Sequence, residues 1–404
     1  MGNTIMIDIN ILFIRKIILL FLFLYITQYI IGCNRNINNK LPLELDKSYD
    51  IINLINYGDL DKLKTIVKMD KRSVYRINDK GHTILHIAVE NEDIRIVKYI
   101  LNHKLIDVNS KSKTMDTPLH FAAMIGNQLI VIELVKNGAN INEKNNLNNT
   151  PLHFASQMGY YDIVKYFLNN RGDINVQNKF GQTPLHLSSM NGLFSIVKLL
   201  VEFGACVNKQ TFDGYTPLHQ ASQYGHSDIV RFLLENGADV NMLSNNLENS
   251  LLLYLSSENP DLETINYFLD QGIDLNTPNS SGLSPLLLSI YKKRIDIVAI
   301  LLKYKININA VSKFGITPLF GAVNMNNIDC VKLLLKNGAN PNFQLVNGDT
   351  PLHVAIKKGF TEIVKVLILA GANTNIPNNL GKKAVDLLTD KKLGNRETGN
   401  GAIH

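Results

Sequence analysis

Apolar residues along the chain fall into short stretches that recur about every 33 residues. In one representative stretch, Ile163, Val164, Phe167 and Leu168 occupy positions i, i+1, i+4 and i+5. This spacing places them along one side of a helix, and the stripe is wide enough to touch both a hairpin partner and a neighbouring unit. The pattern therefore predicts short helices that are packed on two sides.

A second signal predicts where these helices begin and end. Threonine at a helix start accepts a hydrogen bond from a free backbone N–H, and proline fits the first turn. Glycine adopts left-handed backbone conformations that reverse the chain or end a helix. Each unit is therefore predicted to be a helix, a turn and a second helix. Thr-Pro-Leu-His begins at Thr117, Thr150, Thr183, Thr216 and Thr350, with a variant at Thr83 and weaker copies at Ser284 and Thr317. The turn glycines are Gly159, Gly192 and Gly225, and those ending second helices are Gly138, Gly204, Gly237, Gly338 and Gly371.

Each copy continues with a small residue, a central glycine, an Ile-Val-x-x-x-Leu-like block and Gly-Ala-x-x-Asn, as in residues 228–241. In these features the chain resembles the ankyrin repeat family over nearly everything after residue 47. The resemblance implies an all-α solenoid of stacked helix-turn-helix units with hairpin loops, which binds another protein through its concave surface. Because each repeat contacts only its neighbours, stability is shared along such an array.

The repeat register also predicts the organisation of the chain. We expect a capping repeat at the N-terminal end of the array, nine full repeats after it, and a half-repeat with a tail at the C-terminal end. The tail loses its apolar periodicity after Leu388. The expected boundaries are 48–78 for the cap, 79–378 for the nine repeats and 379–404 for the last segment.

The unit at 245–279 departs from the pattern. Asn249-Ser250-Leu251-Leu252 replaces Thr-Pro-Leu-His, a proline, Pro260, lies in the turn between the helices, and the unit is 35 residues long. Its second helix is still expected over Leu262 to Asp270. Two interpretations stay open: a drifted repeat that still stacks, or a bend or weak joint that divides the array.

The N-terminus carries a pattern of its own. Arg15 and Lys16 precede an apolar run of 16 residues, 17–32. This is about 24 Å of helix, shorter than the roughly 30 Å hydrocarbon layer of a membrane. The layout is that of an export signal. The residues Ile30-Ile31-Gly32-Cys33 resemble the bacterial lipobox, which implies that Cys33 is acylated and begins the mature chain.

We therefore expect residues 1–32 to be a signal peptide or membrane anchor and residues 33–47 to be a flexible tether. An uncleaved signal-anchor helix with a single membrane pass stays open, as does a soluble protein that starts at Met6. The opening Met1-Gly2-Asn3 does not fit myristoylation, because position 6 is not Ser or Thr. The expected location is a bacterial cell envelope, on its periplasmic or surface side.

Charge and motifs argue against several other functions. The formal net charge of +6 is too small to favour nucleic acid as a partner. The sequence carries no Gly-rich phosphate loop, no Gly-x-Ser-x-Gly, no His-Glu-x-x-His and no zinc-spaced cysteine pairs. Cys206 and Cys330 lie in different repeats, which does not indicate a disulfide framework; Cys330 is expected to be buried and Cys206 exposed. We expect a monomer without enzyme activity, cofactor or metal.

A histidine recurs in the Thr-Pro-Leu-His motif. Adjacent repeats lie about 10 Å apart, whereas the ligands of one metal ion lie within about 2.1 Å of it, so these histidines cannot share an ion. The family resemblance implies that each ring bonds to backbone between repeats. Leu252, Leu287 and Phe320 replace the histidine in three repeats, which we expect to be less rigid. The histidines are His86, His120, His153, His186, His219 and His353.

Function is expected at the variable positions, which in ankyrin-like arrays are the hairpin tips and the exposed side of the first helix. Methionine and aromatic residues, which are enriched at protein interfaces, gather there in repeats two to five. The sequence therefore predicts a membrane-tethered scaffold for a protein partner. An exported effector that binds a host protein is the second hypothesis, and packing between repeats or scattered exposure is the alternative reading of these residues. The predicted partner contacts are Met124, Ile125, Met158, Phe180, Met190, Phe212, Tyr215 and Tyr224.

Overall fold

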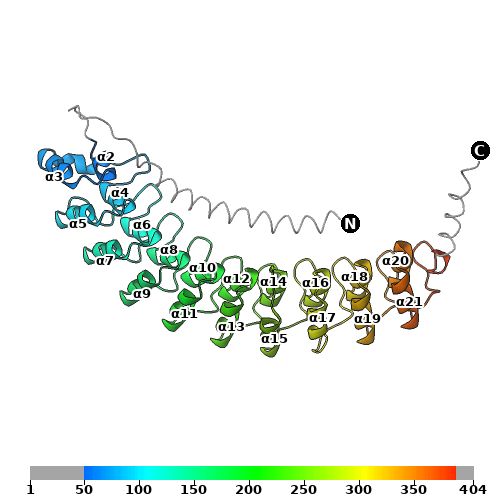
Figure 1. The fold of residues 1–404 in the computed structure, drawn as a ribbon. Helices are drawn as coiled ribbons and strands as arrows, with labels where there is room; N and C mark the ends of the chain where they lie inside the picture. The colour runs from blue at the N-terminus through cyan, green and yellow to red at the C-terminus, as the bar shows by residue number, and fades with distance from the viewer. Residues whose placement is uncertain (1–49, 388–404) are drawn as a thin grey trace, which may run out of the picture. The chain divides into compact units, whose positions relative to one another are not determined.

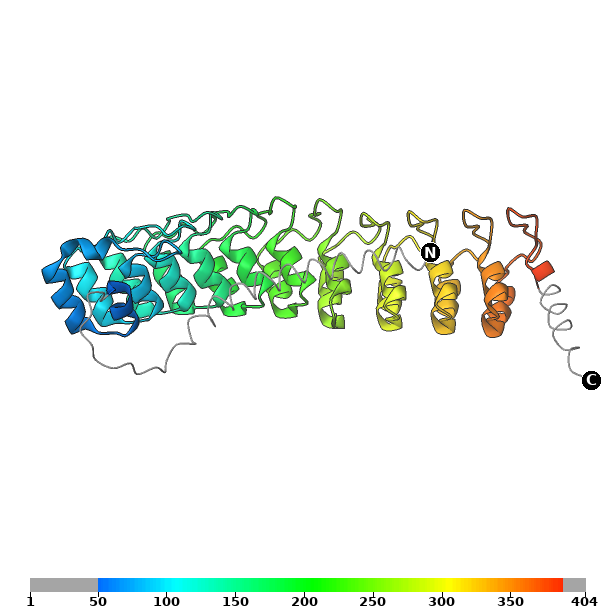
Figure 2. The same cartoon turned by 90° about the horizontal axis from the view of Figure 1, so that it is seen from above.

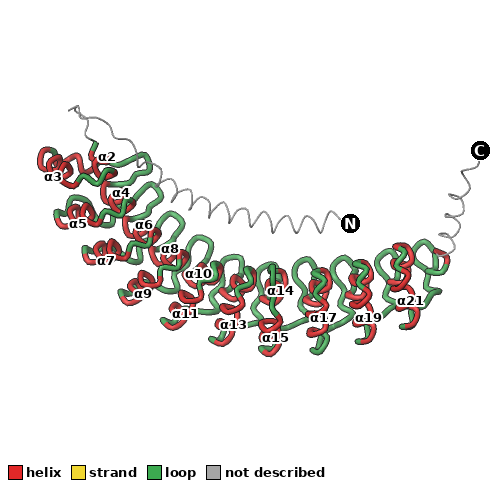
Figure 3. The backbone as a smooth tube through the Cα atoms, viewed as in Figure 1, coloured by secondary structure: helices red, strands yellow, loops and turns green. Residues whose placement is uncertain are grey.

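The computed structural model describes residues 50–387, in which 20 α-helices and one short 3-10 helix alternate with loops (Figure 3). Over these residues the only sheet-like contact is an isolated bridge between Pro377 and Lys383. The predicted all-α class is therefore confirmed. The chain divides into two compact units, with the boundary between Ala139 and Asn140, and each unit is described by itself.

Unit 1 begins with a helix pair and a 3-10 helix that precede two further pairs. The first helix of each pair packs on the first helix of the next, because α2 contacts α4 and α4 contacts α6, while α5 contacts α7 in a second row. Its elements are α2 (Ile51–Asn56), α3 (Leu60–Met69), η1 (Lys71–Tyr75), α4 (Ile84–Glu90), α5 (Ile94–Asn102), α6 (Pro118–Ile125) and α7 (Gln128–Lys136).

Unit 2 contains seven helix pairs. Its first helices, α8 to α20, lie side by side in one row, and its second helices, α9 to α21, form another row (Figure 1). The loops that connect consecutive pairs project along one side of the helices (Figure 2). The first helices are α8 (Pro151–Met158), α10 (Pro184–Met190), α12 (Pro217–Gln223), α14 (Ser250–Ser256), α16 (Pro285–Tyr291), α18 (Pro318–Asn324) and α20 (Pro351–Lys358). The second helices are α9 (Tyr161–Asn169), α11 (Phe194–Glu202), α13 (Ser227–Glu235), α15 (Leu262–Asp270), α17 (Ile295–Leu301), α19 (Ile328–Lys336) and α21 (Thr361–Leu369).

The Thr-Pro helix starts are confirmed. In α10, Thr183 is the N-cap, Pro184 follows it, and the Thr183 hydroxyl accepts the backbone N–H of His186 at 3.4 Å. The helices are short, from six residues in α2 to ten in α3. Isolated helices of this length are marginal in water, so packing between neighbours supplies their stability. The predicted left-handed glycines are also confirmed, as at Gly159, with a φ of 83° between α8 and α9.

The departing unit at 245–279 folds as a helix pair, and its second helix has the predicted bounds, Leu262–Asp270. Its first helix, α14, packs on α12 before it and on α16 after it, and α15 packs on α13. Unit 2 continues through this segment without a division. The arrangement supports a drifted repeat that still stacks, in place of a joint between two blocks.

The two cysteines of the helical array are free and lie as predicted. Cys330 is buried in α19, and burial raises the pKa of its thiol to about 11, so the thiolate is scarce at neutral pH. Cys206 is exposed after the end of α11. In the described part of the chain, no helix is both long and apolar enough to cross a bilayer. The predicted signal segment 1–32, the tether 33–47 with Cys33, and the tail beyond 387 lie outside the described residues.

Candidate functional site

Backbone hydrogen bonds join five consecutive hairpin tips of unit 2, between residues 147 and 280. The N–H of Lys179 donates to the carbonyl oxygen of Leu147 at 2.9 Å, and one repeat further on the N–H of Phe212 donates to the carbonyl oxygen of Phe180 at 3.3 Å. Consecutive tips therefore form a ladder that holds each loop against the next. Side chains on neighbouring tips are positioned by this ladder and not by their own loop alone.

Glycine makes one step of this ladder possible. Gly181 has a φ of +75°, and a Cβ built on it would lie 2.5 Å from the backbone nitrogen of Phe212. That is closer than any real Cβ contact, so a larger residue would push the two tips apart. The glycine therefore fixes the approach of the tip that carries Phe180 to the tip that carries Phe212.

Large apolar side chains stand exposed on this ladder. Phe180 is 51% exposed and Phe212 is 66% exposed, and Leu147 and Leu247 are exposed on the tips before and after them. Four consecutive tips of unit 2 thus present an apolar side chain to solvent, a set that we call the tip row. The prediction from sequence missed Leu147 and Leu247. Their place in the hairpin tip could have revealed them. Leu147 directly precedes the left-handed residue of its tip, and Leu247, with a φ of 58°, is itself the left-handed residue of the next tip but two.

The predicted contacts on the first helices are only partly accessible. Met158, Met190 and Tyr224 are each half-buried near the end of a first helix. The ring of Tyr224 stacks on His226 with centroids 6.3 Å apart, and His226 Nε2 lies 3.0 Å from the carbonyl oxygen of Met190 in the preceding repeat. Burial raises the pKa of Tyr224. These side chains therefore contribute to packing between repeats and present only part of their surface.

The structure does not place all of the predicted contacts together. Met124 and Ile125 are half-buried at the end of α6 in unit 1. Tyr215 is only 7% exposed, its hydroxyl donates to Glu248 Oε2 at 2.9 Å, and its ring lies edge-on to His219. The prediction that Tyr215 is an accessible partner contact is wrong, because a carboxylate of the next repeat draws its side chain inward.

The motif histidines bond to backbone between repeats, as the family resemblance implied. In α10, Nδ1 of His186 accepts the backbone N–H of Thr183 at 3.1 Å, so the proton of the neutral ring lies on Nε2, which donates to the carbonyl oxygen of Tyr215 at 3.0 Å. Burial lowers the pKa of His186 to about 4. The same inter-repeat bond joins His86 to Asp116, His153 to Gln182, His219 to Glu248 and His353 to Lys382.

The asparagine of Gly-Ala-x-x-Asn has a role that the sequence did not reveal. The amide nitrogen of Asn208 donates to the carbonyl oxygen of Gly237 at 2.9 Å, and its amide oxygen accepts the N–H of Asp239 at 2.8 Å. One side chain thus satisfies a donor and an acceptor of the next repeat. The same paired bonds recur at Asn142, Asn241, Asn276 and Asn342. These asparagines therefore have a structural role. The positions that vary between repeats are those of the hairpin tips.

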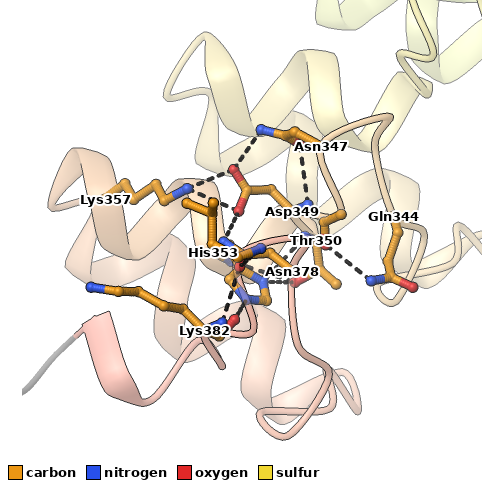
Figure 4. A network of polar contacts seen from close by, with 10 residues as sticks. Gln344, Asn347, Asp349, Thr350, His353, Lys357, Asn378 and Lys382 are labelled. Atoms are coloured by element: carbon orange, nitrogen blue, oxygen red, sulfur yellow. Dashed lines mark hydrogen bonds and ion pairs between the residues drawn. The ribbon is translucent and has the colours of Figure 1, made fainter.

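A charged network closes the last complete repeat (Figure 4). Asp349 is buried, and its carboxylate accepts hydrogen bonds from Lys357 Nζ at 2.6 Å and from Asn378 Nδ2 at 2.9 Å. Burial alone would raise the pKa of Asp349, but these hydrogen bonds outweigh it and hold the pKa below its usual value. The network pins α20 to the chain that follows α21, so Lys357 is a structural cation.

Within residues 50–387, no group of three or more histidine, cysteine, aspartate or glutamate side chains is placed to hold a metal ion. Large apolar side chains stand exposed on the tips, and others stand exposed where α9, α11, α15 and α17 begin. Only those of the tips are joined from repeat to repeat by backbone hydrogen bonds. Because the tips are rigidly joined and apolar, they fit the burial of a surface belonging to another macromolecule.

Comparison with known families agrees with the geometry. A family model described as ankyrin repeats in three copies matches residues 104–178, 166–244 and 306–378, which together are more than half of the chain. A single ankyrin repeat also matches residues 80–113. The chain belongs to the ankyrin repeat family, and ankyrin repeats indicate a protein partner. The matches leave out residues 245–305, which begin with the departing unit.

Curated relatives are similar over short stretches. Rabankyrin-5 of Mus musculus is 30% identical over 91 residues, which are 22% of this chain and 8% of that protein. A probable E3 ubiquitin-protein ligase of Oryza sativa subsp. japonica is 33% identical over 95 residues, 23% of this chain and 21% of the ligase. A palmitoyltransferase of Homo sapiens is 27% identical over 114 residues, 28% of this chain and 18% of the enzyme. The chain spans less than a quarter of the length of each, so these matches share repeats and not whole proteins.

Proposed function

We propose that this protein is a membrane-tethered, non-catalytic scaffold that binds a protein partner through the tip row of unit 2. The observation that carries the proposal is the pair Phe180 and Phe212, two exposed aromatic side chains held side by side by a backbone hydrogen bond between their tips. Aromatic side chains on a rigid surface contribute most to protein interfaces, because little conformational entropy is lost when they are buried.

Replacing both phenylalanines of the tip row is expected to abolish partner binding without unfolding the array. Full burial of a phenylalanine is worth about 1.5–3 kcal/mol, and each ring here still exposes half or more of its surface. The variant Phe180→Ser, Phe212→Ser should therefore lose about 2 to 4 kcal/mol of binding free energy, or roughly thirtyfold or more in affinity. A photocrosslinking amino acid at position 180 of the full chain, expressed in the source cells, measures the contact directly.

The control uses exposed apolar residues at the second helices of the same unit. Phe203 follows α11 and Leu369 ends α21, and both are exposed. A crosslinker at position 369 should give no adduct, and Phe203→Ser, Leu369→Ser should leave the adduct at position 180 unchanged. Equal adducts at positions 180 and 369, or an adduct at 180 that survives Phe212→Ser, would refute the tip row. The half-buried Met158, Met190 and Tyr224 are poorer probes, because changing them also alters packing.

The tethering part of the proposal is supported by the N-terminal sequence, with Arg15 and Lys16, the apolar run and Cys33. Intact mass of the mature protein, extracted from membranes, is expected to show a chain that begins at Cys33 and carries a diacylglyceryl group. Cys33→Ala should remove that mass and block processing. A mature chain that retains residues 1–32 would instead favour the uncleaved signal anchor. More than one acyl chain is needed for stable attachment to a bilayer.

The enzymatic names among the relatives are not carried over to this chain. The matches to the ligase and to the palmitoyltransferase cover about a fifth of those proteins, and the described part of this chain is filled by helix pairs of the array. We therefore propose a binding function alone, in which the partner supplies any chemistry.

A further inference from the structure

The N-terminal end of unit 1 differs from an ordinary end of a repeat array. Terminal repeats usually present a polar outer surface, because no further repeat covers them. Here the pair α2 and α3 with η1 presents large apolar side chains instead. Met69 is 81% exposed and Tyr75 is 71% exposed, and Tyr57 and Ile77 are also exposed. An exposed group of this kind indicates a surface that is covered in use.

The same segment carries basic side chains without acidic partners. Lys68, Lys71 and Arg72 are exposed, and none of them forms an ion pair with another residue of the described chain. The other basic residues of this end are paired, with Lys62 on Asp59, Lys64 on Asp61 and Arg76 on Asp50. The unpaired positive charge is therefore concentrated where Met69 and Tyr75 are exposed.

Local geometry keeps these residues close together. Lys68 and Met69 lie in the last turn of α3, and η1 begins two residues after Met69. In a 3-10 helix, side chains three residues apart lie on the same side, so Arg72 and Tyr75 share a side of η1. Ser73 and Val74 are buried and hold η1 against the array. We call the exposed residues Lys68, Met69, Lys71, Arg72 and Tyr75 the basic cap.

We propose that the basic cap binds the surface of an anionic lipid bilayer. Basic side chains interleaved with aromatic and other large apolar ones are the pattern of interfacial membrane binding, in which the cations meet lipid headgroups and the apolar groups enter the interface. The proposal rests on the proposed tether. The described chain begins at Asp50, and the 17 residue-to-residue steps from Cys33 to Asp50 span at most about 60 Å when fully extended. A lipid anchor on Cys33 would therefore keep the basic cap near the bilayer.

The charge of residues 34–47 argues against this segment as the surface that covers the basic cap. Between residues 34 and 47 the basic residues Arg35, Lys40 and Lys47 outnumber the acidic residues Glu44 and Asp46. This segment is not complementary to a basic surface. An anionic bilayer is complementary to it, and each basic residue near such a surface contributes about 1 kcal/mol. The exposed carboxylate of Asp70, between Met69 and Lys71, offsets about one of the three charges, so the net effect is roughly a thirtyfold shift toward the bound cap.

The chain contains no tryptophan, so a single Tyr75→Trp substitution gives an unambiguous fluorescent probe of the basic cap. The full chain with this probe is added to vesicles of phosphatidylcholine alone or with phosphatidylglycerol, with and without brominated acyl chains. We expect the emission to shift to the blue and to be quenched by brominated lipid only when phosphatidylglycerol is present. High salt should reverse the effect, because screening weakens the attraction of the cations.

A matched pair of charge reversals tests the cause. Lys68→Glu, Lys71→Glu, Arg72→Glu in the probe background should abolish the quenching. The same change of charge at Lys303, Lys332 and Lys336, which are exposed in unit 2, should leave it intact. Thermal unfolding followed by circular dichroism checks that both variants fold.

Flotation of the vesicles distinguishes binding by the basic cap from attachment by the lipid tether. A chain that floats with both lipid mixtures but is not quenched overturns the cap proposal and leaves the tether. A chain that floats only with phosphatidylglycerol and is quenched supports the cap and contradicts the tether. Flotation with neither mixture overturns both. Three other outcomes would overturn the anionic bilayer as the surface that the basic cap binds. Equal quenching in vesicles of phosphatidylcholine alone would favour neutral lipid, and a blue shift without quenching would favour the chain's own N-terminal segment. A blue shift that grows with protein concentration would favour a second copy of the chain.

Discussion

Lowering the pH from 7.5 to 5 is expected to destabilise unit 2 by about 4 kcal/mol. His186 and His219 are fully buried, and burial lowers the pKa of each to about 4 in the folded protein, against about 6.5 for an exposed histidine. Between these two values the unfolded chain binds protons that the folded chain cannot. Each histidine then costs about 2 kcal/mol at pH 5.

The direction of the pH effect follows from the depressed folded pKa. Above pH 6.5 both states hold neutral rings, and the stability contributed by the histidines is complete. It is lost as the pH falls from 6.5 toward 4, where the folded state begins to be protonated as well. In His186, protonation also puts a proton on Nδ1, which accepts the N–H of Thr183, the N-cap of α10. Protonation therefore removes a helix-cap bond as well as charging a buried ring.

Urea unfolding of the full chain at a series of pH values measures this effect. The variant His186→Leu, His219→Leu is the control, because leucine already occupies the equivalent position at Leu252 and Leu287. The variant should be less stable at pH 7.5, since it leaves buried backbone groups without partners. Its free energy of unfolding should depend much less on pH between 6.5 and 5. An unchanged slope would show that other groups titrate in this range.

Replacing Tyr254 by alanine is expected to destabilise unit 2 by about 3 to 5 kcal/mol, as for other large buried aromatic residues. Tyr254 is fully buried in α14 and packs against Phe268 of α15, with ring centroids 5.8 Å apart. The equivalent position is small in the neighbouring repeats, where Ala221 and Ser289 occupy it. The tyrosine therefore fills space that the departing repeat alone contains.

A polar network surrounds the tyrosine hydroxyl. The hydroxyl of Tyr254 donates to the carboxylate of Asp261, which is the N-cap of α15. The same carboxylate also accepts a hydrogen bond from Ser227 of the preceding repeat. Burial by itself would raise the pKa of Asp261, but hydrogen bonds from Ser227, Tyr254 and Thr264 outweigh it and hold the pKa far below its usual value. The longer turn of this repeat thus carries a carboxylate that ties two repeats together.

Tyr254→Phe separates the two contributions. It keeps the ring and removes only the hydroxyl, so it should cost about 1 to 3 kcal/mol. Urea unfolding gives the total loss for each variant, and hydrogen exchange of the amides in α14 and α15 shows whether the loss is local. If Tyr254→Ala were as mild as Tyr254→Phe, the ring would not be filling the repeat and the hydroxyl network would dominate.

The substitution of the motif histidine is partly compensated at this repeat. Asn249, which replaces threonine as the N-cap of α14, accepts the N–H of Leu252 at 2.9 Å. Its amide nitrogen donates to the carbonyl oxygen of Asp274 at 3.2 Å, in the loop that follows α15. The reduced rigidity that we expect for the repeats with Leu252, Leu287 and Phe320 stays a prediction, and the hydrogen-exchange measurement above also tests it.

Much of the fold was predictable because its signals are local. A threonine cap such as Thr183, the proline after it and a left-handed glycine such as Gly159 act on their own few residues, so the helix bounds follow from sequence. The second helix of the departing repeat, Leu262–Asp270, was predicted for the same reason. The family resemblance rested on these same residues, and it correctly implied the backbone bond of the histidines.

The candidate site was predictable only in part, because exposure depends on residues about 33 positions away. Phe180 and Phe212 were selected correctly as exposed, since a hairpin tip is exposed in any repeat. Tyr215 was not, because its burial depends on Glu248, a carboxylate of the following repeat. No pattern within one repeat contains that information.

The sequence by itself therefore determined the helices, the order of the repeats and the positions that vary, since each depends on the preferences of neighbouring residues. Only the tertiary structure decided which variable side chains are exposed, as at the tip row, and which are drawn between repeats, as at Tyr215. It also decided that Lys68, Lys71 and Arg72 have no acidic partner while Lys357 is bound by Asp349. The reason is physical: burial and charge pairing arise between repeats, where residues distant along the chain are packed against one another.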